Sequence, residues 1–462
     1  MYGFFQRTSP SAYYSDLETE FGLDGAGIGS LSSAYFYAYA IAQIPYGIAM
    51  DKYGPLIVVS MCSLFTFAAA LLFSLSESLF FTYVGRSLVG FFVGVAWIAS
   101  VKSIQDEAYF DGKKQILTGF SMSLGMLGGT LGQGPLAALV NASGWRFAMS
   151  ITSMVPLTGF VVASTVFFLK SKLLRAEDNQ TNSFSDIDAH DDTAVVPVRC
   201  SGATKNDAHV HESLECSKDR SQTTVTTINI LLKALRMKTN IYMMLYFMFA
   251  FVNLLAFASL WAVPFFTQVG KVNQAAAGIA ATFYIVGTGI GSPVGGAISD
   301  RFKGRKRHIM IFALCLTTTF TLLVVLGTGT WFSIYVAGFL MFIAGLGQGP
   351  HMVVFFVAKE QNPEDLVGTA LAIINIGGIL AGAFFQPLLG AVLDIGWDGK
   401  VGSKGERLWD HNHMRITFSL MLTVCNAIAF LIVVFLIPKD NARDEGCVER
   451  HVIEDDERRE VV

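Results

Sequence analysis

The sequence predicts an all-α membrane protein of two six-helix bundles, with about eleven full membrane crossings because the first helix is incomplete. Two observations lead to this prediction. The 462 residues are 52% hydrophobic and 15% charged, a composition too apolar for soluble domains of this length. Apolar runs of about 20 residues, the helical length that crosses roughly 30 Å of hydrocarbon, recur along nearly the whole chain.

The apolar runs form a front group of five and a back group of six. In chain order they cover residues 27–49, 56–76, 79–101, 115–140, 146–169, 241–266, 275–298, 308–327, 331–357, 367–393 and 415–437. A Ser, Thr, Asn, Asp and His-rich stretch without periodicity lies between the groups and predicts a disordered linker. The expected units are an N-terminal bundle, this linker, a C-terminal bundle and a tail, at residues 1–170, 171–240, 241–438 and 439–462.

The front group is one helix short of the back group. Tyr2 to Arg7 resembles the last turns of a helix that emerges into the polar stretch from Thr8 to Asp24. So short a segment cannot span a bilayer, and neither a basic leader nor a full apolar core marks a signal peptide. We expect a first helix truncated in this sequence, or else a short re-entrant segment packed on the protein.

Basic residues are divided unevenly between the two sets of links. If successive runs alternate sides, one set holds most of the Lys and Arg, whereas the other holds few, among them Arg7 and Arg146. Because basic side chains mark the cytoplasmic side, we expect the first set, the linker and the C-terminus in the cytoplasm. No acidic dileucine signal is present. The plasma membrane and a lysosome- or endosome-type organelle therefore both stay open.

Two links on the basic side repeat one pattern. The first copy consists of Gly47, Asp51, Lys52 and Gly54. The second consists of Gly296, Asp300, Arg301, Gly304 and Arg305. Glycine permits a tight turn, Asp can cap a neighbouring helix N-terminus, and the cation can pair with acidic or carbonyl ends. Such contacts can close one face reversibly, so we expect these two links to act as gating loops.

This pattern resembles the signature loop of the major facilitator superfamily, Gly-x-x-x-Asp-Arg-x-Gly, which is echoed in the family's second half. In the front copy, Pro55 and Leu56 stand where the family usually has basic residues. The resemblance covers the chain apart from the linker and tail. It implies a secondary transporter of a small organic solute, such as a dipeptide, an amino acid or an organic anion. Alternating access of two bundles around a central site would be its mechanism.

Arg86, with Gly90 in the sequence GRSLVG, is similar to the family's motif on helix four. An arginine inside a membrane span is costly and usually faces protein or water. Arg86 therefore either binds an anionic group on the transport path or forms a structural ion pair. The sequence leaves both roles open.

Other polar side chains inside apolar runs need partners, so they are further candidates for the solute path. One stripe at helical spacing consists of Tyr35, Tyr39 and Gln43. Another contains Asn253 and Trp261, just before a kink expected at Pro264. Single candidates are Gln348, Asn375, Gln133, Gln386 and His351. The same stripes can also serve as ordinary helix packing.

Carboxylates are scarce inside the runs, because Glu77, Asp106 and Asp394 sit at their ends. A proton carrier would lie in the incomplete first helix or nowhere in this sequence, so facilitated diffusion or exchange stays open. No H-E-x-x-H, G-x-S-x-G or C-x-x-C pattern is present, and we expect no enzyme, metal or cofactor.

The expected partners follow from the same observations. They are the lipid bilayer and a small-molecule solute, and no protein partner is predicted. The net charge of −3 gives no basic surface for nucleic acid. The remaining rival is a transport-inactive solute sensor or receptor with the same fold.

Overall fold

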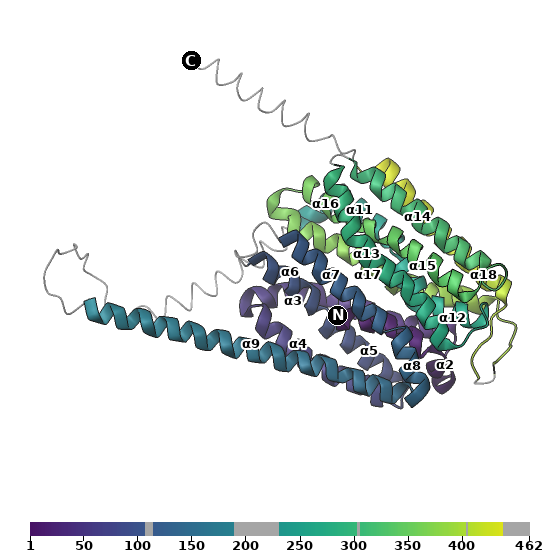
Figure 1. Cartoon of the computed structure of the whole chain (residues 1–462), viewed down its shortest axis with the longest axis horizontal. Helices are drawn as coiled ribbons and strands as arrows, with labels where there is room; N and C mark the ends of the chain where they lie inside the picture. The colour runs from purple at the N-terminus through teal and green to yellow at the C-terminus, as the bar shows by residue number, and fades with distance from the viewer. Residues whose placement is uncertain (107–113, 189–230, 303–304, 403–404, 438–462) are drawn as a thin grey trace, which may run out of the picture.

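The computed structural model describes residues 1–106, 114–188, 231–302, 305–402 and 405–437, and these residues form helices joined by links. Two isolated β-bridges are the extent of the extended pairing in these ranges. Figure 1 shows two neighbouring groups of long helices, the front one in purple to blue and the back one in green to yellow. The prediction of an all-α fold in two groups is confirmed.

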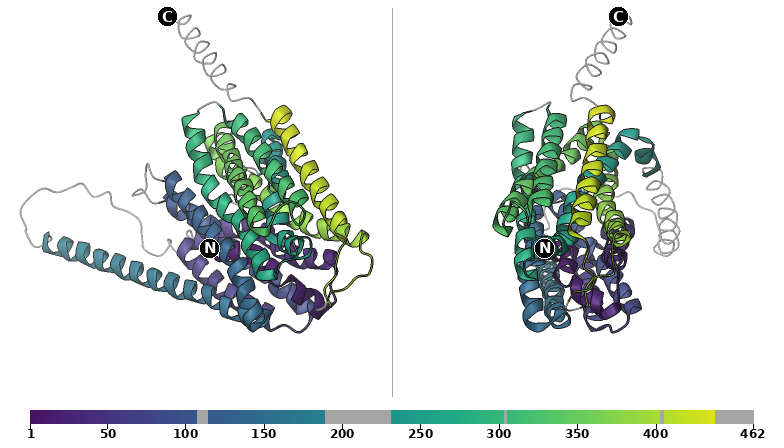
Figure 2. Two further views of the ribbon diagram at one scale, coloured as in Figure 1. Left: turned by 45° about the vertical axis from the view of Figure 1, so that its right-hand side comes forward. Right: turned by 90° about the vertical axis from the view of Figure 1, so that its right-hand side faces the viewer.

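The front group follows a short helical start. The start consists of α1 (Tyr2–Thr8), the 3-10 turn η1 (Ser9–Ala12) and α2 (Tyr14–Phe21). The long helices are α3 (Gly25–Tyr53), α4 (Pro55–Leu75), α5 (Leu79–Val93), α6 (Val95–Asp106), α7 (Lys114–Leu131), α8 (Gly134–Ser143) and α9 (Trp145–Asp188). Helix α9 continues past the expected boundary at 170 and projects beyond the bundle (Figures 1 and 2). Of the linker expected at 171–240, residues 171–188 belong to α9 and 189–230 lie outside the described residues, as does the expected tail at 439–462.

The back group begins with three segments that together make one crossing. These are α11 (Lys238–Ala250), the π-helical η3 (Asn253–Trp261) and α12 (Ala262–Gln268). The remaining segments are α13 (Gln274–Arg301), α14 (Lys306–Gly327), α15 (Ile334–Gln348), the 3-10 turn η4 (Gly349–Met352), α16 (Val353–Gln361), α17 (Glu364–Ile395), α18 (His411–Leu431) and the π-helical η5 (Ile432–Leu436).

Prolines explain why several expected runs are broken helices. Pro135 lies in the first turn of α8 and has no N–H for the carbonyl of the preceding turn, so α7 ends before it. Pro350 likewise begins η4 between α15 and α16. Near the kink expected at Pro264, the irregularity lies earlier in the chain. The segment η3 is π-helical and ends at Trp261, and Pro264 itself lies in the first turn of α12.

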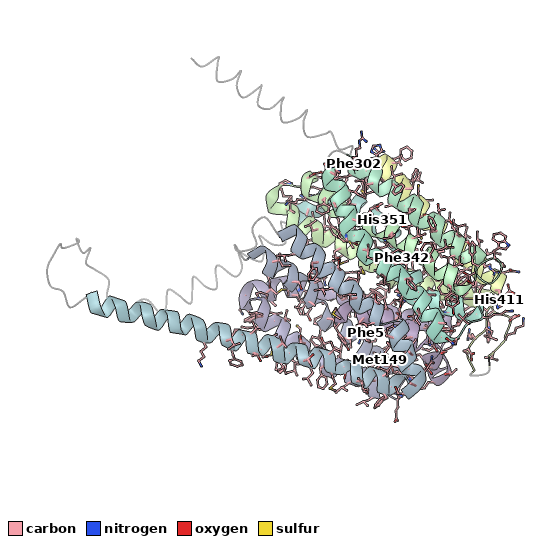
Figure 3. The ribbon with its side chains drawn as sticks, viewed as in Figure 1. Phe5, Met149, Phe302, Phe342, His351 and His411 are labelled. Atoms are coloured by element: carbon pink, nitrogen blue, oxygen red, sulfur yellow. The ribbon has the colours of Figure 1, made fainter. Side chains whose placement is uncertain are left out.

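Nine helices among the described residues are long and apolar enough to cross a membrane. They correspond to nine of the eleven expected runs, which confirms an integral, multi-pass membrane protein. Helix α3 and the broken pair α7–α8, which stand for the runs 27–49 and 115–140, do not meet the same criterion. Large apolar side chains such as Phe80, Phe312 and Phe339 are exposed, as lipid contact requires. Figure 3 shows side chains projecting from the outer surfaces of the helices.

The two bundles meet through α3 against α17 and through α7–α8 against α13. Helices α3 and α17 run so close together that a Cβ on Gly390 would lie 2.0 Å from the backbone oxygen of Gly25. A Cβ on Gly29 would lie 2.5 Å from the backbone oxygen of Gln386. We call this end of the molecule, where α3 begins and α17 ends, the closed face. The opposite end, with Lys52 and Arg301, is the motif face.

Hydrogen bonds between the bundles also gather at the closed face. The N–H groups of Gly25 and Ala26 donate to the carboxylate of Asp394 at 3.0 and 2.8 Å. Nearer the middle of the molecule, the Tyr37 hydroxyl donates to the Ala383 carbonyl at 3.0 Å. Within the described ranges, most of the bonds between the bundles come from the closed-face half of the helices. The bond from the Ser123 hydroxyl to the Gly289 carbonyl, at 3.4 Å, lies just past the middle toward the motif face. This end of the interface is therefore sealed in the observed conformation.

Candidate functional site

Arg86 on α5 is buried inside the front bundle, with 1% of its surface exposed. Its guanidinium donates to the side-chain oxygen of Gln6 at 2.9 Å and to the backbone oxygen of Gln6 at 2.6 Å. The guanidinium also lies 5.1 Å from the centre of the Tyr35 ring. Among the described residues no carboxylate is within ion-pair distance, so the partners of this buried cation are neutral.

A second guanidinium, that of Arg7 at the end of α1, lies in the same bundle. It is half-buried and packs 4.5 Å from the centre of the Phe4 ring and 4.9 Å from that of Tyr39. The sequence placed Arg7 in a sparsely charged link, whereas the structure places it in the packed N-terminal segment. That segment is too short to span a bilayer, so only its tertiary packing reveals that Gln6 and Arg7 lie inside the bundle.

The stripe on α3 faces this N-terminal segment and α5. The Tyr35 hydroxyl donates to the Gly3 carbonyl at 3.0 Å, and the Tyr35 and Tyr39 rings stack with their centres 5.9 Å apart. Gln43 donates to the carbonyls of Tyr39 and Gly94 at 3.3 and 3.4 Å. The predicted stripe is therefore buried, with Tyr35 against Arg86 and Tyr39 against Arg7. Its contact with a solute stays a prediction.

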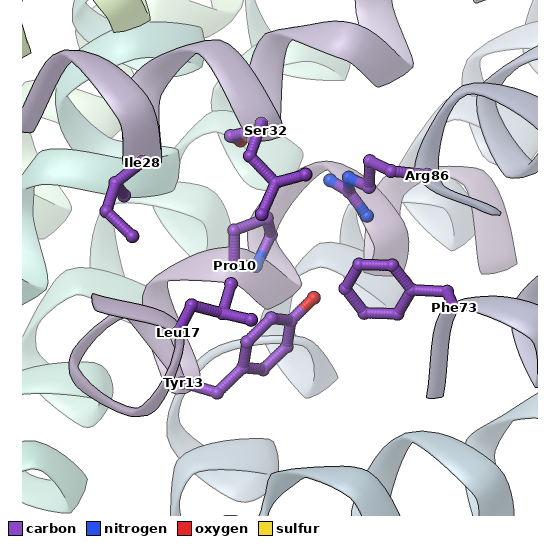
Figure 4. Close-up of a pocket in the computed structure, with 8 residues that line it drawn as sticks. Pro10, Tyr13, Leu17, Ile28, Ser32, Phe73 and Arg86 are labelled. Atoms are coloured by element: carbon purple, nitrogen blue, oxygen red, sulfur yellow. The ribbon is translucent and has the colours of Figure 1, made fainter. Parts of the chain in front are cut away.

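A small cavity lies beside Arg86 (Figure 4). Its lining consists of Pro10, Tyr13, Leu17, Ile28, Leu31, Ser32, Phe73 and Arg86. The cavity volume is about 10 Å³, which is room for about one water molecule. An organic solute does not fit there, so this cavity gives no solute access to Arg86 in the observed conformation.

A second group of predicted residues surrounds the π-helical η3. The wider turns of a π-helix interrupt the regular backbone hydrogen bonds of the α-helix, and two glutamines donate hydrogen bonds to backbone carbonyls of η3. Gln386 from α17 donates to Leu255 at 2.7 Å, and Gln133 from the joint between α7 and α8 donates to Ala258 at 2.6 Å. Because Gln133 belongs to the front bundle and Gln386 to the back one, η3 contacts both bundles.

Amide side chains on η3 and around it keep spare acceptor oxygens. The Asn253 amide donates to the side-chain oxygen of Asn426 at 3.0 Å, and the Trp261 indole donates to the backbone oxygen of Gln386 at 3.0 Å. The side-chain oxygens of Gln133, Asn253 and Gln386 are buried without a hydrogen-bond partner. The region can therefore accept hydrogen bonds from a donor group when the bundles rearrange.

Gln348 and His351 lie together inside the back bundle, where Figure 3 labels His351. The Tyr284 hydroxyl donates to Gln348 at 2.9 Å, and the Tyr246 hydroxyl lies 2.6 Å from Nδ1 of His351. These contacts join the broken helix α15–η4 to α11 and α13. Asn375 lies apart from them, half-buried on α17.

The motif loops join helix pairs at the motif face. Gly54 is the joint between α3 and α4, and its φ of 77° lies in the left-handed region that glycine adopts without strain. Lys52, Arg301 and Arg305 are exposed. Gly304 and the side chains of Asp51 and Asp300 lie outside the described part of the chain, and Gly47 and Gly296 are within α3 and α13.

Two cations that follow the second loop are tied to their own bundle. Lys306 forms an ion pair with Glu360 of α16, and Arg307 donates to the backbone oxygen of Val434 in η5. Both contacts involve helices of the back bundle only. The gating role of the loops stays a prediction.

Two bundles of apolar helices that meet at one face, with arginines packed inside the front bundle and buried amides around η3, are typical of one class, the multi-pass membrane transport proteins. The chain belongs to the Major Facilitator Superfamily, whose family model matches residues 1–384 and 243–452. Members of this family carry out secondary transport of small solutes and are not enzymes. The expected family and fold are thereby confirmed.

Curated relatives are transport proteins. The chain is 21% identical over 403 residues to a probable hexose phosphate transport protein of Chlamydia trachomatis, covering 86% of this chain and 83% of that one. It is 29% identical over 157 residues to a probable sulfoacetate transporter of Cupriavidus necator, covering 34% of this chain and 36% of that one.

Solved structures show the same fold. A bacterial homolog of the human lysosomal transporter Spinster, in an inward-facing and unoccupied conformation, matches with a TM-score of 0.64 and 16% identity, covering 94% of both chains. A D-xylose-proton symporter matches with a TM-score of 0.60 and 14% identity, covering 95% of this chain and 96% of that one. At these identities the likeness concerns the fold alone.

Proposed function

We propose that this protein carries a small organic anion across a membrane by alternating access, with Arg86 and Arg7 supplying positive charge on the solute path. The observation that carries the proposal is that neither guanidinium has a carboxylate partner among the described residues. An arginine inside a membrane protein usually pairs with an acid, lines a water-filled path or binds a ligand. An anionic solute would supply the missing countercharge.

The names of the relatives support an anion over the other solutes that the sequence left open. Hexose phosphate and sulfoacetate both carry a phosphate or sulfonate group, which the forked guanidinium binds well. The spare amide oxygens of Gln133, Asn253 and Gln386 would accept hydrogen bonds from donor groups elsewhere on the solute. We therefore favour an anion that also carries hydroxyl or ammonium groups.

The observed conformation is one of the two states that such a cycle needs. In it, the closed face is sealed by α3 against α17 and by α8 against α13. We infer that rocking of the N-terminal bundle against the C-terminal bundle opens this face, and that the loops at Asp51 and Asp300 hold the motif face shut in that second state. From the distribution of Lys and Arg, we infer that the motif face is cytoplasmic.

A comparison of solute pairs that differ in charge tests the anion proposal. Purified protein is heated with a hexose phosphate or with the parent hexose, and with sulfoacetate or with a neutral analogue of the same size. Since a ligand that binds the folded state raises its melting temperature, we expect a concentration-dependent rise with at least one anion and none with its neutral partner. Equal stabilisation by the charged and neutral members of each pair would contradict the proposal.

A further inference from the structure

A buried carboxyl group lies between the two bundles at the closed face. Glu18 on α2 is only 3% exposed. Its Oε1 accepts a hydrogen bond of 3.1 Å from the backbone N–H of Arg407, in the link between α17 and α18. Its Oε2 is buried and has no hydrogen-bond partner. One contact between the front and back bundles is therefore made by a buried carboxyl group of which only one oxygen accepts a hydrogen bond.

The neighbouring carboxylate of Asp394 shows what full compensation looks like. It accepts two N–H groups at the N-terminus of α3, where the helix dipole favours negative charge. It also accepts from the guanidinium of Arg407 at 3.3 Å. That guanidinium is further packed 4.2 Å from the centre of the Trp397 ring. Arg407 thus offers its side chain to Asp394 and only its backbone N–H to Glu18.

The surroundings of Glu18 favour its neutral form. The titratable groups that face it are Arg407 and Glu406 from the link, Asp394 from α17, and Tyr14 from α2 itself. Burial is the largest influence and raises the pKa of Glu18 from 4.5 to about 8. The negative charges of Glu406 and Asp394 add to the rise, whereas the N–H and the charge of Arg407 oppose it. Helix α2 lies outside the nine membrane-crossing helices.

We propose that Glu18 is a proton-binding site of the closed face, protonated while the two bundles meet there and ionised once they part. Parting the bundles exposes the carboxyl to water, which stabilises its charge. While the bundles meet, the carboxylate of Asp394 has two N–H donors and a cation, whereas Glu18 has one N–H donor and a buried oxygen without a partner, so Glu18 is the carboxyl that closure favours in its protonated form. The proposal rests on the alternating-access cycle proposed above.

The direction of the pH effect follows from the two states. Between pH 4.5 and about 8 the closed face holds one more proton than the open face. The contribution of protonated Glu18 to the stability of the closed face is therefore fully present below pH 4.5. It is lost as the pH rises toward 8. Across this window the ratio of closed to open molecules falls about tenfold for each pH unit.

Distance measurements on the purified full-length chain test this proposal. The six native cysteines are replaced, and spin labels are attached through Ala142→Cys at the end of α8 and Trp331→Cys in the link after α14. Both positions are exposed. We expect a short distance to dominate at about pH 5 and a longer one to grow as the pH is raised to about 9.

Two variants separate Glu18 from other groups. Glu18→Gln keeps the acceptor oxygen for Arg407 and cannot ionise, so the short distance should persist at every pH. Asp398→Asn is the control, since Asp398 lies in the same link at the surface and the hydrogen bond from Lys400 lowers its pKa. The Asp398→Asn variant should show the same pH dependence of the spin-label distance as the wild type.

Two results would overturn the proposal. One is a wild-type distance that does not change over this pH range. The other is a Glu18→Gln variant that opens with the pH dependence of the wild type, which would assign the effect to another group. The spin-label distance is measured without solute. If opening depends on Glu18 but no solute crosses the membrane in a flux measurement, the result counts against the transport proposal and not against the proton site.

Discussion

At the level of single residues, Arg86 is held by a neutral partner. Gln6 contributes both a side-chain and a backbone oxygen to its guanidinium, and the ring of Tyr35 covers it. Neither partner neutralises the charge. The Nε atom of Arg86 is buried and has no hydrogen-bond partner. The guanidinium therefore retains the capacity to bind an anion once solute and water reach it.

Arg86→Lys tests whether the geometry of the guanidinium matters. Lysine keeps the positive charge but loses the planar fork that binds phosphate, sulfonate or carboxylate through two hydrogen bonds. We expect the affinity for the anion to fall by about tenfold or more, since a hydrogen bond to a charged group contributes about 1.5–3 kcal/mol. Titration calorimetry with the anion that stabilises the wild type would measure this.

Arg146→Lys is the matched control for that substitution. Arg146 is an arginine of the same bundle that is paired with Glu20 at the closed face. The Arg146→Lys substitution should leave the affinity for the anion unchanged. An Arg86→Lys variant that binds as tightly as the wild type would instead show that Arg86 has a structural role.

The residues around Arg86 were predictable from the sequence to different degrees. An arginine within an apolar run stands out, and so do Tyr35 and Tyr39 at helical spacing. Gln6 and Arg7 do not, because they end a segment too short to span a bilayer, and Glu18 does not, because it lies in a polar stretch that has the composition of a link. Their burial depends on the packing of these segments against distant helices, which no local pattern encodes.

At the level of helices, the contact between α3 and α17 depends on glycine. Gly25 and Gly390 bring the two backbones together at the closed face, where a Cβ on Gly390 would lie 2.0 Å from a backbone oxygen. Backbone atoms cannot rotate away as a side chain can. Any side chain at this position therefore forces the two helices apart.

Gly390→Ala should weaken the closed face. Overpacking of this kind typically costs about 1–3 kcal/mol, so the ratio of closed to open molecules should fall roughly fivefold to a hundredfold. The spin-label distance between positions 142 and 331 would report the change. Gly368→Ala is the control on the same helix, because a Cβ there meets nothing, and it should not alter the distance. Equal distances in both variants would show that the glycine contact does not hold the face closed.

The apolar runs predicted where helices lie but not where they break. The run 115–140 is broken before Pro135, and the run 241–266 contains the π-helical η3. The first break has a local cause in Pro135, whereas the π-helical segment receives donors from elsewhere in the fold, since Gln133 and Gln386 bond to carbonyls of η3. Propensity along the chain contains no information about these distant partners.

At the level of the whole molecule, the fold followed from composition, apolar runs and the two matching loops. The conformational state did not, because the sequence shows the small residues of α3 and α17 without showing which of them meet. The structure adds a state that is sealed at one face, with the motif loops at the other. A transporter has to alternate between this state and its opposite, whereas a solute sensor does not need to.

Flux through sealed vesicles is the most direct test of the transport claim. The purified full-length chain is reconstituted, and an anion that stabilises it against heating is supplied outside in labelled form. We predict saturable uptake that becomes faster when the same anion, unlabelled, is trapped inside, because alternating access permits exchange. An anion that binds the protein but crosses no faster than it does in empty vesicles would contradict the account.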